Sequence, residues 1–177
     1  MIGSQKASKK VNPKVSNQLS ILFAPEGTNQ ATQDFTELIL KLLNRYPRIN
    51  FTLRLHPNLN KSLMTEYVLF RLKKYSNFTI SKNSLEKDLA ASKFVFYRSS
   101  AVGIEALKSN SVPVFYSGTN QGELDALCFS NDISVTMKSI KDFSKILTID
   151  NRNENVQRKY FDALFSKLDY SILNKLQ

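Results

Sequence analysis

Apolar residues follow two alternating patterns along the chain. Short apolar runs are separated by longer stretches in which apolar side chains recur every third or fourth position. In residues 32–46, for example, Phe35, Leu38 and Leu42 share one helical face, and Pro47 ends the pattern. The predicted strands are residues 19–24, 50–55, 78–81, 93–97, 113–116 and 133–136. The predicted helices are residues 32–46, 62–75, 84–90, 101–109, 139–147 and 154–173.

Strands that alternate with helices at this spacing favour right-handed βαβ units. We therefore predict a Rossmann-like, three-layer α/β domain with a mostly parallel sheet of about five to six strands. Parallel sheets bind ligands just beyond the carboxyl ends of their strands. The loops to inspect for a site are residues 25–30, 56–61, 81–84, 98–100 and 117–121.

The length and composition indicate one globular domain. The chain has 177 residues, of which 42% are hydrophobic, which is enough to form a core. Residues 1–17 are polar and are predicted to be a disordered lead or linker, so the domain spans residues 18–177. The single cysteine, Cys128, suits a reducing compartment. No apolar run has the length of a membrane span, and no apolar segment typical of a secretory signal stands at the start. These features predict a cytoplasmic location, either free or peripheral to the inner face of the membrane.

The formal net charge of +10 narrows the choice of partners. A solvated basic surface would explain it, and so would attraction to phosphate-bearing ligands or to an anionic membrane surface. Zinc-finger spacing, an RNP-type aromatic motif and an Arg-rich helix are all missing, so no specific nucleic-acid partner is expected.

The first of these loops contains Gly27, Thr28 and Asn29. Glycine lets the backbone approach a ligand closely, and a helix N-terminus favours an anion. An ordinary turn with an N-cap remains the alternative. The loop lacks the Gly-Lys-Ser/Thr of a Walker A motif and the glycine spacing of a dehydrogenase dinucleotide site.

The only histidine, His56, directly follows an apolar strand and precedes Pro57. A histidine there can donate a hydrogen bond to a phosphate oxygen, and when protonated it can offset charge on a leaving phosphate. Strand alternation places Arg54 on the same face. His56 is therefore the candidate catalytic residue, with a buried structural histidine as the alternative.

Two further loops supply candidate ligand-binding residues. Arg98, Ser99 and Ser100 precede a helix, where two hydroxyl groups and free backbone N–H groups would form a phosphate cradle. Arg98 adds charge if it points inward. Ser81 and Asn83 are weaker candidates for contact with a base or ribose.

Other chemistries find little support. One His and one Cys cannot form a His/Cys zinc site, and no Gly-x-Ser-x-Gly elbow accompanies a catalytic serine. Glu105 is expected to lie too deep in its helix to reach a ligand at the first turn, and to be a buried structural acid. We therefore expect no metal and no cofactor.

Taken together, Arg-x-His-Pro after one strand and Ser-Ser before a later helix resemble the C-terminal domain of bacterial GT-B glycosyltransferases. The similarity is greatest to enzymes that use CMP-activated sugars, namely sialyltransferases and the Kdo transferases of capsule synthesis. It covers residues 19–116 and includes the stretches 88–107 and 112–116.

The resemblance implies a role for each matched residue. His56 and the pair Ser99 and Ser100 would hold the nucleotide phosphate, and residues 81–83 would meet the nucleoside. The family's catalytic base is an Asp in an acidic-acidic-Gly motif of the N-terminal acceptor domain. The segment Pro25-Glu26-Gly27 resembles that motif only locally and lies in the other half of the fold. We therefore expect a metal-independent, donor-binding domain for a nucleotide-activated sugar, which needs an acceptor domain or partner protein. A non-catalytic module of the same fold and a nucleotide-sugar epimerase-like protein are the alternatives.

Overall fold

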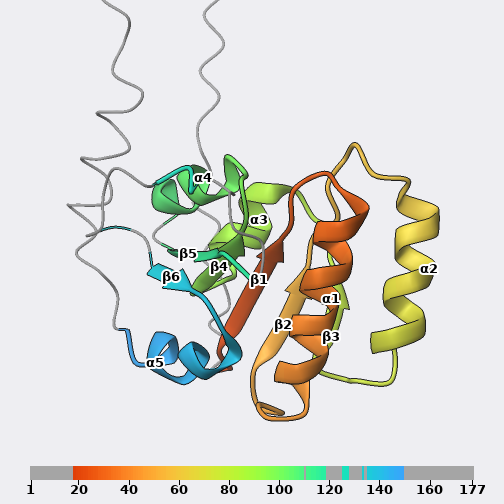
Figure 1. Ribbon diagram of the computed structural model, residues 1–177, viewed down its shortest axis with the longest axis horizontal. Coiled ribbons are helices and arrows are strands. Elements are labelled where there is room, and N and C mark those ends of the chain that lie inside the picture. Colours follow the sequence, from red (N-terminus) through yellow and green to blue (C-terminus); the bar gives the residue numbers. More distant parts are fainter. Residues whose placement is uncertain (1–17, 110, 119–124, 128–132, 134, 150–177) are drawn as a thin grey trace, which may run out of the picture.

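A computed structural model describes residues 18–109, 111–118, 125–127, 133 and 135–149. Within these residues, six parallel strands form one sheet between two layers of helices (Figure 1). The strands are β1 (Ser20–Ala24), β2 (Asn50–Leu53), β3 (Phe78–Ile80), β4 (Phe94–Tyr97), β5 (Val112–Tyr116) and β6 (Val135–Met137). The helices are α1 (Asn29–Leu43), α2 (Lys61–Leu72), α3 (Leu85–Ala90), α4 (Val102–Lys108), the 3-10 turn η1 (Ile140–Asp142) and α5 (Phe143–Leu147).

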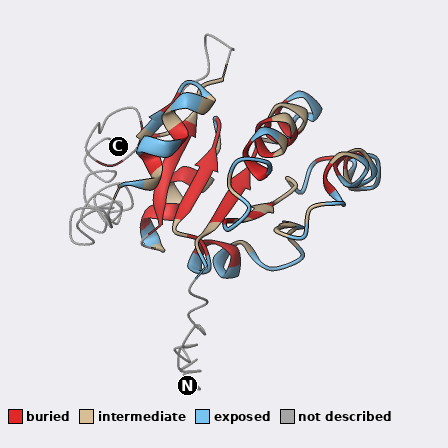
Figure 2. Ribbon diagram, turned by 90° about the horizontal axis from the view of Figure 1, so that it is seen from below, coloured by how far each residue is buried: buried red, intermediate tan, exposed pale blue. Residues whose placement is uncertain are grey.

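The sheet has a buried side chain on both of its faces at almost every central position. In β1, Ile21 and Phe23 pack with α1, α2 and α5, whereas Leu22 points the other way and packs with α3 and α4. Figure 2 shows the central strands as almost entirely buried and the outer sides of the helices as exposed. This two-sided burial explains why β1, β4 and β5 are nearly continuous apolar runs rather than alternating ones. The predicted three-layer α/β fold is confirmed.

The predicted element boundaries shift by a few residues for identifiable reasons. The first helix begins three residues earlier than predicted, at Asn29, because the Thr28 hydroxyl accepts the Ala31 N–H at 3.1 Å and caps it. The predicted cap of α3 is confirmed, since the Ser84 hydroxyl accepts the Lys87 N–H at 3.4 Å. The predicted lead 1–17, the predicted helix 154–173 and Cys128 lie outside the described residues.

The strand order is β3-β2-β1-β4-β5-β6, which determines where a ligand can enter. The chain proceeds from β1 outward to β3, then returns to the other side of β1 and proceeds outward again from β4. The loops that leave β1 and β4 therefore diverge to opposite faces of the sheet. In such sheets this divergence opens a crevice at the carboxyl ends of the two strands.

Candidate functional site

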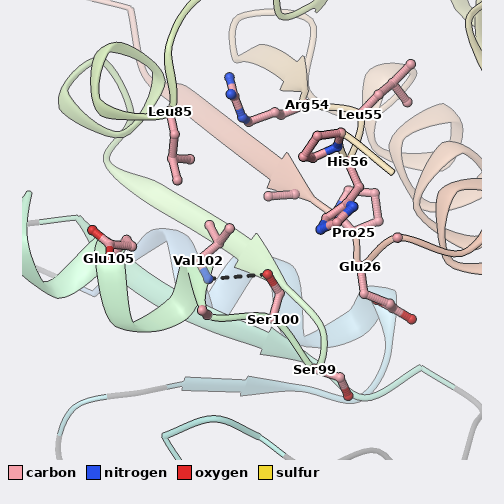
Figure 3. A pocket seen from close by; sticks show the side chains of 14 residues that line it. Pro25, Glu26, Arg54, Leu55, His56, Leu85, Ser99, Ser100, Val102 and Glu105 are labelled. Carbon is pink, nitrogen blue, oxygen red and sulfur yellow. Dashed lines mark hydrogen bonds between the residues drawn. The ribbon is translucent and has the colours of Figure 1, made fainter. Parts of the chain in front are cut away.

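A pocket of about 610 Å³ lies at the point where the chain reverses its direction across the sheet. The loops that follow β1, β2 and β4 form its walls (Figure 3). Of the residues predicted for a site, Gly27, Arg54, His56, Ser99 and Ser100 line it. In Figure 3, Arg54 and His56 lie on one side of the pocket, and Ser99 and Ser100 lie across from them. The structure thus brings the histidine and the two serines, which are more than 40 residues apart in sequence, to one cavity.

The ring of His56 packs directly against Gly27. A Cβ atom built on Gly27 would lie 2.7 Å from His56 Nδ1, closer than real Cβ atoms come, and 3.2 Å from Cε1. The glycine is therefore required for the close approach of the imidazole, rather than of the backbone to a ligand. Its φ is not in the left-handed region, so backbone conformation does not add to that requirement.

One nitrogen of His56 is already engaged by the backbone. The Asn58 N–H donates to His56 Nδ1 at 3.2 Å, so Nδ1 is an acceptor. A neutral imidazole held in this way carries its proton on Nε2. The half-buried His56 can therefore offer an Nε2–H donor to a ligand oxygen.

The serine loop has an unusual backbone. Ser99 has φ +40°, and it is the one non-glycine residue with positive φ among the described residues. A left-handed conformation costs a residue with a Cβ about 1–2 kcal/mol, and such strain concentrates at ligand-binding positions. Ser100 Oγ accepts the Val102 N–H at 3.3 Å (Figure 3). Because α4 has only seven residues, the two side chains matter more here than the dipole of the helix.

The loop after β3 is held by a buried acid that sequence reasoning did not single out. Asp88 Oδ2 accepts hydrogen bonds from Arg54 Nη1 at 2.8 Å and Ser81 Oγ at 2.5 Å, and Asp88 Oδ1 accepts one from Asn83 Nδ2 at 3.2 Å. Arg54 Nη1 also donates to the Asn83 carbonyl at 2.8 Å. Ser81 and Asn83 line a second hollow of about 460 Å³ that shares Arg54 and Leu55 with the first pocket.

A sequence signal for Asp88 existed. It lies between Leu85, Leu89 and Ser92 at helical spacing, on the face of α3 that turns inward. A charged residue on the inner face of a helix requires partners, which the loops nearby supply.

Two predicted site residues, Thr28 and Arg98, line neither the pocket nor the second hollow. Thr28 is exposed and its hydroxyl is used as the N-cap of α1. Arg98 is buried on the α1 side of the sheet, where its Nη1 donates to Asp34 Oδ2 at 2.9 Å and its Nε to the Tyr116 carbonyl at 3.3 Å. Its guanidinium carbon lies 5.5 Å and 5.2 Å from the ring centroids of Phe35 and Tyr116. Burial raises the pKa of the Tyr116 hydroxyl, and the charge of Arg98 partly opposes that shift.

Two carboxylates also line the pocket, and one of them corrects a prediction. Glu105 was expected to lie too deep in its helix, but α4 begins at Val102, so Glu105 falls in the first turn and reaches the cavity. Glu26 lines the wall formed by the loop after β1. Carboxylates accept hydrogen bonds from hydroxyl groups, which sugars and ribose supply. Among the described residues, no group of three or more His, Cys, Asp or Glu is placed to hold a metal ion.

Comparisons with known proteins show the fold. No protein-family model matches the sequence, and no curated protein matches it significantly. Three of the solved structures that match illustrate this, and each match covers more than four fifths of this chain. The UDP-GlcNAc 2-epimerase of Neisseria meningitidis, solved bound to UDP-GlcNAc, has a TM-score of 0.58 at 15% identity and covers 85% of this chain and 46% of its own. TarM has a TM-score of 0.59 at 16% identity, over 93% of this chain and 35% of its own.

The third structure is the C-terminal domain of a group 1 glycosyl transferase, LpcC, from Francisella tularensis. Its TM-score is 0.56 at 12% identity, and the match covers 84% of this chain and 85% of that domain. The chain has the fold of one half of a GT-B protein. This GT-B half spans less than half of the epimerase and TarM chains. The predicted resemblance to GT-B glycosyltransferase halves is thereby confirmed for the fold, which epimerases share.

Proposed function

We propose that this GT-B half binds a nucleotide-activated sugar in the pocket lined by His56, Ser99 and Ser100. It would serve as the donor-binding half of a glycosyltransferase in surface glycan synthesis, with a CMP-sugar as the favoured donor. The observation that carries the proposal is the convergence of these residues, from two separate strand ends, on one pocket at the reversal point of the sheet.

The pocket residues suit a phosphate that gains charge. Transfer breaks the bond between the sugar and the donor phosphate and forms a bond from the sugar to an acceptor oxygen, so the nucleotide leaves with the electron pair. His56 Nε2–H and the two hydroxyl groups would donate to the phosphate oxygens as this charge develops. Donors of this kind perform the task without a metal ion, and we propose metal-independent transfer.

Arg54 and the carboxylates would orient the rest of the donor. Arg54 Nη1 donates hydrogen bonds to Asp88 and to the Asn83 carbonyl. The other N–H groups of Arg54, which lines both hollows, would donate to the ligand. Glu105 would accept hydrogen bonds from hydroxyl groups of the ribose or the sugar. Residues 81–83 stay the proposed contact to the nucleoside, since they lie at the edge next to Arg54.

The acceptor and its base would come from a second GT-B half or a partner protein. The likeness to an epimerase solved with UDP-GlcNAc keeps an epimerase-like activity as the second candidate. The products distinguish the two activities. A transferase releases free nucleotide and a glycosylated acceptor, whereas an epimerase inverts one carbon of the sugar. We propose a cytoplasmic location, either free or peripheral to the inner face of the membrane.

A titration followed by backbone NMR tests the donor proposal. We expect CMP or CDP to shift the amide signals of residues 25–28, 54–58 and 99–102, with smaller shifts for residues 81–84, and UDP and GDP to act more weakly. Signals from β6 and α5, which lie away from the pocket, serve as the internal control. If none of the four nucleotides moves the pocket signals, this half does not bind a nucleotide donor.

A further inference from the structure

The outer face of α2 carries the apolar side chains that the fold leaves uncovered. Among the described residues, the exposed large apolar side chains are Phe70, Leu63 and Leu69, at 81%, 54% and 41% exposure. All three belong to α2, which lies at the outer edge of the domain beside α1 (Figure 1). The opposite face of the same helix is buried in the core. Core packing therefore explains only one of the two apolar faces of α2.

Basic residues lie at the C-terminal end of α2. Exposed Lys73 and Lys74 follow the last turn of α2. The segment after them is tied to the turn after α1, since Tyr75 Oη donates to Asn44 Oδ1 at 3.0 Å. That turn carries two more exposed cations, Arg45 and Arg48.

Acidic side chains are scarce on the same face. Glu66 lies on it, and Glu37 of α1 is occupied by Arg71, whose Nη2 lies 2.5 Å from its carboxylate. Lys73 and Lys74 thus come within five residues of Leu69 and Phe70, and the hydrogen bond between Tyr75 and Asn44 ties the turn with Arg45 and Arg48 to the same end of α2. We call the set Leu63, Leu69, Phe70, Lys73, Lys74, Arg45 and Arg48 the α2 face.

We propose that the α2 face docks on an anionic lipid surface. An exposed aromatic ring and leucines flanked by lysines and arginines are suited to the boundary between head groups and acyl chains. The apolar side chains would enter that boundary, and the cations would meet lipid phosphates. The formal charge of +10 over the whole chain acts in the same direction. A protein partner of matching shape would need a strongly acidic apolar patch, whereas an anionic bilayer supplies both features everywhere on its surface.

One residue of the α2 face reaches the hollow beside the candidate site. Leu69 lines the second hollow, which shares Arg54 and Leu55 with the pocket that contains His56. The cations of the α2 face lie at the other end of the sheet, since Arg45 and Arg48 precede β2 and Lys73 and Lys74 precede β3. The docking itself does not depend on the proposed function, because it requires no nucleotide.

Vesicle flotation of the full chain tests the proposal. The probe is phosphatidylcholine vesicles with and without about one third phosphatidylglycerol. We expect binding to the anionic vesicles that is lost at about 0.5 M salt. Neutralising Lys73→Gln and Lys74→Gln together should lower the partition coefficient roughly 30-fold, since each cation near such a surface contributes about 1 kcal/mol. Phe70→Ala should lower it about tenfold.

The matched control removes the same charge from other helices. Lys87 of α3 and Lys145 of α5 are both exposed, and the pair Lys87→Gln and Lys145→Gln should change partitioning less than about threefold. Circular dichroism confirms that every variant is folded. Three results would each overturn the proposal. The first is an equal loss of vesicle binding in the two lysine pairs, the second is unchanged binding of the Phe70→Ala variant, and the third is self-association through Phe70 without vesicle binding. Nucleotide binding is measured on the same samples, so failure of docking is distinguished from failure of the donor site.

Discussion

Replacing Arg98 with alanine is expected to lower the free energy of unfolding by about 3–5 kcal/mol. The side chain is fully buried and forms an ion pair with Asp34, a hydrogen bond to the Tyr116 carbonyl, and cation–π contacts with Phe35 and Tyr116. Alanine would leave a large cavity and remove the partner of a half-buried carboxylate. Urea denaturation followed by circular dichroism measures the change.

The exposed Arg45 offers the control for this prediction. Arg45→Ala should change the free energy of unfolding by less than about 0.5 kcal/mol. Because Arg98 does not line the pocket, Arg98→Met, which keeps most of the volume, should bind CMP within about threefold of the unsubstituted protein. A stable Arg98→Ala protein that has lost CMP binding would show that Arg98 serves the ligand instead.

A Gly27→Val substitution is expected to weaken CMP binding by about 10- to 100-fold while leaving the protein folded. The new side chain would occupy the space of the His56 ring, since even a Cβ would lie 2.7 Å from Nδ1. The imidazole would have to move, and its bond from the Asn58 N–H would be lost. Gly27 is exposed at the end of the sheet, so the core is not disturbed.

Isothermal calorimetry measures the affinity, and the ¹⁵N signals of the imidazole report whether the ring has moved. Asn29→Ala, two residues away at the exposed start of α1, is the matched control and should bind normally. Unchanged affinity in Gly27→Val, together with a displaced ring, would mean that His56 does not hold the ligand.

The fold was predictable because β1, β4 and β5 are apolar runs between polar loops, as two-sided burial requires, and helical patterns separate them. The pocket was predictable for a related reason, since the residues after β1, β2 and β4 meet at one edge in any parallel sheet of this order. Neither result needed knowledge of side-chain contacts. Both followed from where strands end.

The side on which a loop residue points was harder to predict. Arg98 and Ser99 are adjacent in sequence, yet the Arg98 side chain turns into the core near α1 and Ser99 lines the pocket. The positive φ of Ser99 marks the change of direction. Sequence carries little signal for such a backbone at a serine. Glu105 was misplaced because one residue at the start of α4 decides whether it falls in the first turn. Asp88 was overlooked because an acid in a short helix usually faces solvent.

The central claim is that His56 and Ser100 hold the same phosphate. A double-mutant cycle of His56→Ala and Ser100→Ala, measured by calorimetry with CMP and with cytidine, tests it most directly. Each single substitution should cost about 1–3 kcal/mol of CMP affinity, and the double variant should depart from additivity by about 0.5 kcal/mol or more. Cytidine, which lacks the phosphate, should bind all four proteins alike. Equal losses for CMP and cytidine, or no loss for either, would contradict the claim.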